Sequence, residues 1–163
     1  MEYQIVPIGE RHIAGFHAAL DIVSKEKKYL AFLEAPPLDS TAAFVRDNIK
    51  NDHPQFVVLA GEQVAGWCDI IPSSRPSQAH VGVLGIGLLP AFRGRGIGRQ
   101  LMTVTINKAR DKQMTRIELG VREKNDNAIA LYKRLGFAME GLRRQVMRVD
   151  GVYESLYMMA LLF

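Results

Sequence analysis

The stretch LGIGLLPAFRGRGIGRQL, residues 84–101, is the most informative part of this chain. It begins as an apolar run, turns at Pro90, and passes through a segment rich in glycine and arginine before apolar residues recur at helical spacing. A strand that leads through such a turn into a helix presents the unpaired N–H groups of the first helical turn and the positive end of the helix dipole. Glycines leave these N–H groups uncovered and arginines add positive charge, so the stretch predicts a phosphate-binding site.

Two common phosphate-binding motifs are absent from this stretch. A nucleotide-binding P-loop has Lys followed by Ser or Thr after its last glycine, and neither pair occurs here. A dinucleotide-binding fingerprint that began at Gly94 would need a third glycine where this chain has Arg99. The residues instead form the pattern Arg-x-x-Gly-x-Gly at Arg93, Gly96 and Gly98.

A second segment carries an independent pattern. Residues 125–137 read NDNAIALYKRLGF, which fits Asn-x-x-Ala-x-x-Leu-Tyr-x-x-x-Gly-Phe. The two patterns, in this order and spacing, resemble the signatures of the GNAT N-acetyltransferase superfamily, whose members hold acetyl-CoA. The resemblance extends from about His80 to the C-terminus, and the first half of the chain agrees only in its general pattern.

Length and composition limit the class of protein. A chain of 163 residues with 48% hydrophobic residues can bury a sound core, so we expect residues 1–163 to form a single domain. The single cysteine, Cys68, excludes an internal disulfide. No stretch has the pattern of a secretory signal or is apolar enough to span a bilayer, so we expect a cytoplasmic protein without a membrane partner.

Charge and histidine content exclude two further kinds of partner. The net charge of +4 fits an anionic ligand without requiring a nucleic acid, and the arginines of the turn are not interleaved with aromatic residues. We therefore expect no nucleic-acid partner. The four histidines are scattered without the spacing of metal ligands, so we expect no metal.

The hydrophobic pattern predicts an α/β (α+β) architecture, with a mixed central sheet flanked by helices on both faces. Ser40 is a candidate N-cap for the second helix. The resemblance implies the GNAT fold, which has the same order of elements. The expected elements are a strand at 2–7, helices at 10–28 and 40–51, a hairpin of strands 55–60 and 63–71, a strand at 79–89, a helix from 98 to about 110, a strand at 115–121, a helix at 125–135, and a hairpin of strands 137–149 and 152–162.

The resemblance also implies which residues hold acetyl-CoA. Backbone N–H groups of the glycine-rich turn bind the pyrophosphate, and the strand before it lies beside the pantetheine arm, with the N–H of Leu88 as our candidate for polarising the thioester carbonyl. The side chain of Asn125 contacts the same arm, although this residue is equally well placed to cap the following helix. The implied cofactor-binding residues are Ile86, Gly87, Leu88, Arg93, Gly94, Arg95, Gly96, Ile97, Gly98, Arg99 and Asn125.

Tyr132 matches the tyrosine that acts as general acid in the family, although a tyrosine at such a position is also a common packing residue. The general base is less clear, because the position five residues before Asn125, where many relatives carry Glu, is Gly120. Glu118 lies two residues earlier, on the same face of the strand, and is our candidate. Further candidates are Asp69, Glu34, Glu123, His80 and a water molecule.

The acceptor site should involve the less recognisable parts of the chain. The loop at 30–38 and the final hairpin at 140–154 form its walls, with Phe32, Glu34 and Tyr153 as candidate substrate contacts. We expect an enzyme that transfers acetyl from acetyl-CoA to the primary amine of a small molecule, such as an amino acid. The alternatives are a protein N-terminal or lysine acetyltransferase and a non-catalytic acyl-CoA-binding sensor. The apolar C-terminal strand, residues 156–163, suits a homodimer interface.

Overall fold

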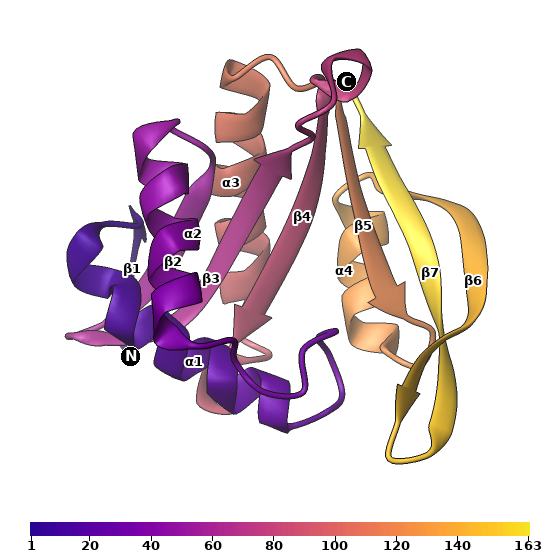
Figure 1. The fold of residues 1–163 in the computed structure, drawn as a ribbon, viewed down its shortest axis with the longest axis horizontal. Helices are drawn as coiled ribbons and strands as arrows, with labels where there is room; N and C mark the ends of the chain where they lie inside the picture. Colours follow the sequence, from indigo (N-terminus) through magenta and orange to yellow (C-terminus); the bar gives the residue numbers. More distant parts are fainter.

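A computed structural model describes residues 1–163 and contains one seven-stranded sheet in the order β1-β2-β3-β4-β5-β7-β6 (Figure 1). Neighbouring strands are antiparallel except for β4 and β5, which are parallel. The sheet is therefore mixed, as the hydrophobic pattern predicts. The strands are β1 (Gln4–Pro7), β2 (Gln55–Ala60), β3 (Gln63–Pro72), β4 (Val81–Leu88), β5 (Arg116–Arg122), β6 (Ala138–Val149) and β7 (Val152–Leu162).

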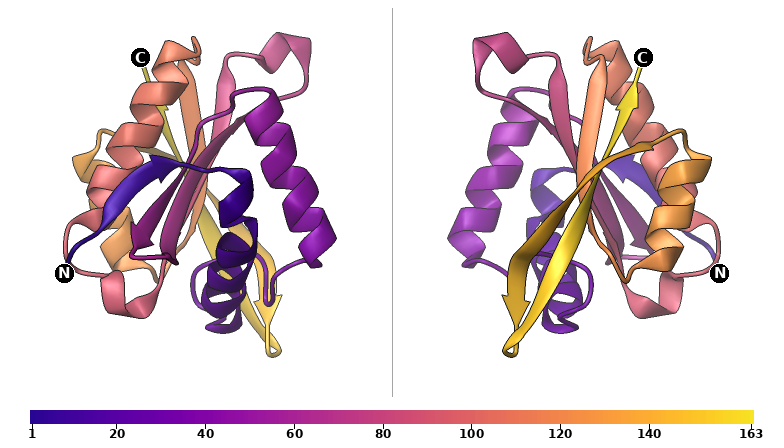
Figure 2. Two further views of the ribbon diagram at one scale, coloured as in Figure 1. Left: turned by 90° about the vertical axis from the view of Figure 1, so that its left-hand side faces the viewer. Right: turned by 90° about the vertical axis from the view of Figure 1, so that its right-hand side faces the viewer.

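Helices cover both faces of the sheet. In Figure 2 the sheet is seen closer to edge-on, with α1 and α2 on one side and α3 and α4 on the other. We call these sides the α1 face and the α3 face. None of the helices is long and apolar enough to span a lipid bilayer. The α-helices are α1 (Ile13–Lys25), α2 (Leu38–Lys50), α3 (Ile97–Asp111) and α4 (Asp126–Arg134), and three short 3-10 turns are η1 (Glu10–His12), η2 (Pro76–Gln78) and η3 (Pro90–Phe92).

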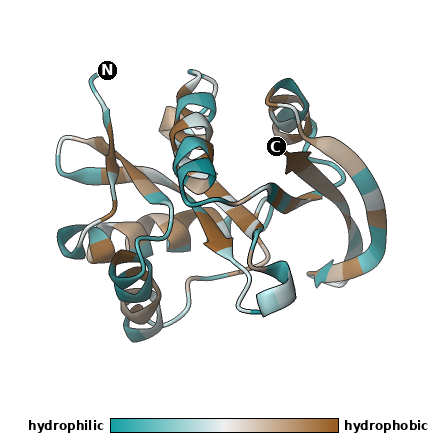
Figure 3. Ribbon diagram, turned by 90° about the horizontal axis from the view of Figure 1, so that it is seen from above, coloured by the Kyte–Doolittle hydropathy of each residue, from teal (hydrophilic) through white to brown (hydrophobic).

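The core lies between the sheet and its two helical layers. Figure 3 shows hydrophobic residues along much of the sheet, whereas each helix carries both hydrophobic and hydrophilic residues. The apolar stripe expected in the helix after the glycine-rich turn is confirmed, because the same spacing of residues is buried in α3. The buried residues of α3 are Ile97, Leu101, Met102, Thr105, Ile106 and Ala109.

Strands β4 and β5 separate along their length, and this separation positions the site. Their pairing extends only from Val81 with Arg116 to Val83 with Glu118. Strand β4 continues for five further residues, to Leu88, while Figure 1 shows the two strands diverging. The backbone edges that face each other beyond Val83 are therefore free of strand partners.

Several expected boundaries are wrong by a few residues. The first helix ends at Lys25 rather than residue 28, and it is preceded by the 3-10 turn η1. Ser40 is not the N-cap of α2, because the helix begins at Leu38 after Pro37. The carbonyl of Pro37 accepts the N–H groups of both Ser40 and Thr41, which places Ser40 inside the first turn.

The final hairpin agrees closely with its sequence pattern. Strands β6 and β7 join through Asp150 and Gly151, which have φ values of 49° and 80°. Two consecutive positive φ values are typical of the two-residue turn that favours Asp-Gly. This hairpin extends the sheet beyond β5 toward the end of α1 (Figure 1).

Candidate active site

The turn between β4 and α3 presents consecutive backbone N–H groups, residues 94–99, that donate no hydrogen bond within the protein. No side chain caps the N-terminus of α3. Gly94 and Gly96 have φ values of 73° and 78°, and no atom lies within 4 Å of the position that a Cβ would take at either residue. The left-handed backbone requires glycine, and the open space above it admits an anion to the helix N-terminus.

The three arginines of this turn are not equivalent. Arg93 donates from Nε to the Leu88 carbonyl at 2.9 Å, and both of its terminal nitrogens donate to the carboxylate of Glu26. The hydrogen bonds to Glu26 raise the pKa of Arg93, and the carboxylate offsets its charge. Arg95 and Arg99 are exposed and form no ion pair, so they are the positive charges available to a phosphate.

The edge of β4 that faces β5 offers further backbone groups. On the other edge, the N–H of Leu89 donates to the carbonyl of Ala65 at 2.8 Å. Because backbone groups alternate in an antiparallel pair, the N–H groups of Ile86 and Leu88 point away from β3 and toward β5. The Leu88 carbonyl already accepts the arginine bond described above, and its N–H remains available to a carbonyl group.

Side chains of β4 alternate between the two faces. On the α1 face, a Cβ at Gly87 would overlap the ring of Trp67, which packs edge-on against Phe16 with ring centroids 5.5 Å apart. On the α3 face, a Cβ at Gly98 would lie 3.6 Å from Leu88. Gly87 is therefore required by packing, and Leu88 lies next to the start of α3. The side chain of Ile97 is buried in the core, so only its backbone is available to a ligand.

Tyr132 of α4 is 8% exposed, and its ring packs against Phe137 with centroids 6.0 Å apart. Its hydroxyl makes no hydrogen bond within the protein. Burial raises the pKa of this hydroxyl, and Cys68 acts in the same direction, so the phenol stays protonated near neutral pH and can serve as a proton donor. Burial also raises the pKa of the Cys68 thiol, which disfavours its reactive thiolate form.

Asn125 caps α4, because its side-chain oxygen accepts the N–H of Ala128 at 3.3 Å. The side-chain nitrogen of Asn125 makes no hydrogen bond within the protein. The two roles considered from the sequence are thus compatible, since the oxygen serves the helix and the nitrogen is free to donate.

Glu118, the candidate general base, lies at the closed end of the gap and is already paired. Arg116 donates from Nε to Glu118 at 3.1 Å and binds Glu140 of β6 with its terminal nitrogens. Glu118 lines a shallow pocket with Val81 and Val83. Because Arg116 already holds this carboxylate, Glu118 is less available to an incoming amine.

The connection between α1 and α2 crosses the α1 face and is fixed at several points. We call residues 26–37 the α1–α2 segment. Buried Arg122 of β5 donates to the carbonyls of Lys27 and Leu30 at 2.6 Å each, and it pairs with Glu154 of β7 at 2.9 Å. Lys27 also reaches Asp150 at the tip of the β6–β7 hairpin, at 3.1 Å. The α1–α2 segment and the β6–β7 hairpin, which carry the two candidate walls of the acceptor site, are therefore joined to each other.

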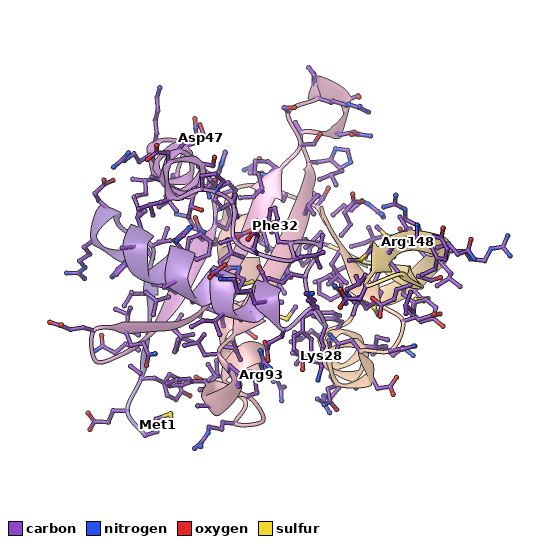
Figure 4. All side chains as sticks on the ribbon, turned by 60° about the horizontal axis from the view of Figure 1, so that its bottom comes forward. Met1, Lys28, Phe32, Asp47, Arg93 and Arg148 are labelled. Atoms are coloured by element: carbon purple, nitrogen blue, oxygen red, sulfur yellow. The ribbon has the colours of Figure 1, made fainter.

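The middle of the α1–α2 segment carries two of the three candidate substrate contacts. Residues 31–34 are exposed, including Phe32 and Glu34. In Figure 4 Phe32 lies in front of the central strands, between α2 and the hairpin that carries Arg148. Tyr153 lies farther out, where its ring is 5.2 Å from the guanidinium carbon of Arg148.

Sequence reasoning did not identify the roles of Glu26 and Arg122. Arg122 is separated from Lys27 by 95 residues and from Leu30 by 92, and Glu26 is 67 residues from Arg93. The only local signal is an arginine at the end of an apolar strand, and arginines with no role in a site are common at the same position.

Arg122→Ala should destabilise the protein and impair the acceptor site. Removal of a buried cation that serves two carbonyls and a carboxylate should cost about 3 kcal/mol. Release of the α1–α2 segment should raise KM for the acceptor more than KM for acetyl-CoA. Urea unfolding and steady-state kinetics measure the two effects. The control is Arg46→Ala, which removes an exposed pair with Glu10 and should change stability little; equal effects of the two changes would contradict the anchoring role.

Comparison with known proteins decides the family. Residues 18–137 match the model of the family described as "Acetyltransferase (GNAT) family". This chain belongs to the GNAT family. It is an N-acetyltransferase, and the family uses acetyl-CoA as its co-substrate. The unpaired N–H groups of residues 94–99 and the free edge of β4 fit a ligand that carries both a pyrophosphate and amide groups.

Relatives in sequence and structure agree with this assignment. The chain is 38% identical over 111 residues to N-alpha-acetyltransferase RimI of Mycobacterium tuberculosis, which covers 68% of each protein. It is 33% identical over 107 residues to L-amino acid N-acetyltransferase AaaT of Escherichia coli, which covers 65% of this chain and 66% of that protein. The structure of yncA, a putative acetyltransferase from Salmonella typhimurium with acetyl-CoA, has the same fold, with a TM-score of 0.92 and 20% identity over 99% of this chain and 94% of that one.

Proposed function

We propose that the acceptor of this GNAT enzyme is the primary amine of a small molecule such as an amino acid. The observation that carries the proposal is the bridge between the two walls of the acceptor site. The α1–α2 segment is tied to β5 by Arg122 and to the tip of the β6–β7 hairpin by Lys27 and Asp150. A site closed on that side suits a compact acceptor better than a long peptide.

The exposed middle of the α1–α2 segment also suits such an acceptor. Phe32 and Leu33 are 52% and 39% exposed, and Glu34 follows them directly. Apolar surface beside a carboxylate can bind an ammonium group that carries an apolar side chain. The identity with an L-amino acid N-acetyltransferase supports the same acceptor class.

The proposed roles of the site residues follow from their positions. Backbone N–H groups of residues 94–99, with Arg95 and Arg99, hold the pyrophosphate of acetyl-CoA. The N–H groups of Ile86 and Leu88 bind the pantetheine arm and the thioester carbonyl, and Asn125 donates to the arm. The amine attacks the carbonyl directly in a ternary complex, and Tyr132 protonates the departing thiolate.

A protein N-terminus is the second candidate acceptor. It is favoured by the 38% identity with N-alpha-acetyltransferase RimI. An N-terminal residue and a free amino acid present the same α-amino group, and they differ in whether a chain continues beyond the carbonyl. The exposed ion pair between Lys27 and Asp150 is the contact that a longer acceptor would have to displace.

Acceptor choice can be measured by acetyl-CoA-dependent thiol release with amino acids, polyamines, aminoglycosides and short peptides that have free N-termini. We expect kcat/KM for at least one amino acid to exceed that of a tripeptide beginning with the same residue by tenfold or more. An N-acetylated amino acid, which lacks the amine, is the control for hydrolysis. Faster transfer to the tripeptide would assign the protein N-terminus instead, and release without any amine dependence would contradict both acceptors.

A further inference from the structure

Asp69 of β3 is a buried carboxyl group without a partner. The residue is 9% exposed, and its carboxyl group forms neither an ion pair nor a hydrogen bond within the protein. Its oxygens nonetheless keep some solvent-accessible surface, whereas the unpartnered polar atoms of Ser24 and Gln55 are fully enclosed. A buried carboxyl group is usually paired, since an uncompensated charge is costly.

The carboxyl group of Asp69 lies on the α1 face, next to a glycine of β4. A Cβ at Gly85 would lie 3.4 Å from Asp69 Oδ1. Trp67, two residues earlier on β3, packs against α1 and so marks the same face. Because Gly85 has no side chain, nothing from β4 separates the carboxyl group from the free edge of that strand.

A second unpartnered group accompanies Asp69. Gln55 of β2 is the cross-strand neighbour of Asp69, and its side chain is 3% exposed. Its Oε1 accepts a hydrogen bond from Asn48 of α2, whereas its Nε2 is enclosed and has no partner. The two neighbouring groups lie on the α1 face together with buried Asn48, which donates to Gln55.

The position of Asp69 relative to the reaction follows from the gap between β4 and β5. The pyrophosphate site at residues 94–99 is at the open end of the gap, and the strands close at Val83. An arm that runs along β4 from the turn passes Leu88 and Ile86 before it reaches the closed end. Gly85 is the next residue along this path, so a thioester carbonyl that accepts the N–H of Ile86, rather than that of Leu88, lies near the level of Asp69.

Acid and base then approach the reacting atoms from opposite faces of the sheet. Tyr132 belongs to α4 on the α3 face, and Asp69 lies on the α1 face, which also carries the α1–α2 segment. Glu118 shares the α1 face, because it pairs in register with Val83, but its carboxylate is held by Arg116. Asp69 has no such cation, so its carboxyl group is free to accept a proton.

We propose that Asp69 accepts the proton that the acceptor ammonium group must lose, directly or through one water molecule. The carboxylate takes one proton from R–NH3⁺, and the neutral amine attacks the thioester carbonyl. The C–N bond forms and the C–S bond breaks, Tyr132 gives its proton to the thiolate, and the second proton of the nitrogen returns to Tyr132. Asp69 then releases its proton to solvent, so the products are the N-acetyl amine, coenzyme A and one proton.

The environment of Asp69 suits this role. Burial raises its pKa to about 7, and no neighbouring charge contributes to the shift. The titratable groups on the surrounding elements are Cys68 beside it on β3, His17, Asp21 and Lys25 of α1, Asp39, Arg46, Asp47 and Lys50 of α2, His53 after α2, and Arg116, Glu118 and Arg122 of β5. A carboxylate with a pKa near the working pH is an efficient base.

Asp69→Asn tests the proposal with little change in shape. In the wild type, kcat/KM should fall as pH drops below about 7, because the carboxylate becomes protonated. In the variant we expect a loss of about 100-fold or more at pH 8, disappearance of this acid limb, and unchanged acetyl-CoA affinity by calorimetry. The loss should shrink for acceptors that are already neutral at the assay pH. Asp111→Asn, at the exposed end of α3, is the matched control and should change none of these quantities.

Two further measurements do not depend on activity. A carbon-13 NMR titration should show one aspartate that titrates near pH 7 and is missing from Asp69→Asn. Since a raised carboxyl pKa favours folding only while the group is protonated, stability from this group is lost as pH rises from about 4 to 7. Asp69→Asn should therefore melt at a higher temperature than the wild type at pH 8, with the difference narrowing toward pH 5.

Three outcomes would overturn the proposal: a pKa near 4 for Asp69, a variant with full activity, or an acid limb removed by Glu118→Gln instead. The proposal rests on acetyl transfer to an amine but not on the acceptor class. A wild type that prefers peptides would contradict the small-molecule acceptor and leave the test of Asp69 unchanged.

Discussion

Gly96→Glu should abolish the binding of acetyl-CoA, with a rise in Kd of more than 100-fold. The Gly96 backbone has a φ of 78° at the N-cap of α3, and nothing in the protein occupies the space above it. A glutamate there would place a carboxylate over the N–H groups of residues 94–99. Its bulk and its negative charge would both exclude a pyrophosphate. Isothermal titration calorimetry with acetyl-CoA measures the effect.

A control substitution at a second glycine distinguishes the loss of acetyl-CoA affinity from the effect of backbone strain alone. Gly61, in the turn between β2 and β3, has a φ of 61° and is equally open. Gly61→Glu should therefore carry a similar cost in stability, about 1 kcal/mol, and retain full affinity for acetyl-CoA. If Gly96→Glu bound acetyl-CoA as tightly as Gly61→Glu, the pyrophosphate site would have to lie elsewhere.

Tyr132→Phe should lower kcat by about 100-fold or more, which is the usual contribution of a positioned proton donor. The substitution removes only the hydroxyl, which makes no hydrogen bond within the protein, and it preserves the packing of the ring on Phe137. Stability and the Kd of acetyl-CoA should therefore change little. Steady-state kinetics, calorimetry and thermal melting together test this pattern.

Tyr157 supplies the control for Tyr132. It is a partly buried tyrosine on β7, paired in register with Val121, and it has no proposed role in the reaction. Tyr157→Phe should leave kcat within about twofold of the wild type. Full activity of Tyr132→Phe would remove this residue from the mechanism, and a large loss of stability would indicate a packing role instead.

Local sequence patterns were sufficient for the parts of the site that one continuous segment builds. The turn at residues 94–99 depends on glycines that adopt positive φ and on a helix that begins directly afterwards, and both features are visible in the sequence. The α3 stripe follows from helical periodicity in the same way. Ser40 shows the limit of such reasoning. It is a favourable N-cap residue, but the N-cap of α2 is Pro37, whose carbonyl accepts the first helical N–H groups.

The sequence by itself determined the order of the elements, the glycine-rich turn with its open helix N-terminus, and the position of Tyr132 in the helix α4, because each depends on residues that are close together in the chain. Only the tertiary structure decided which charges are free. It paired Arg93 with Glu26 and Glu118 with Arg116, and it left Asp69 unpaired beside Gly85. The ionisation of a side chain depends on its burial and on charges brought near it by folding. Glu26 lies 67 residues from Arg93, a distance over which no local pattern carries information.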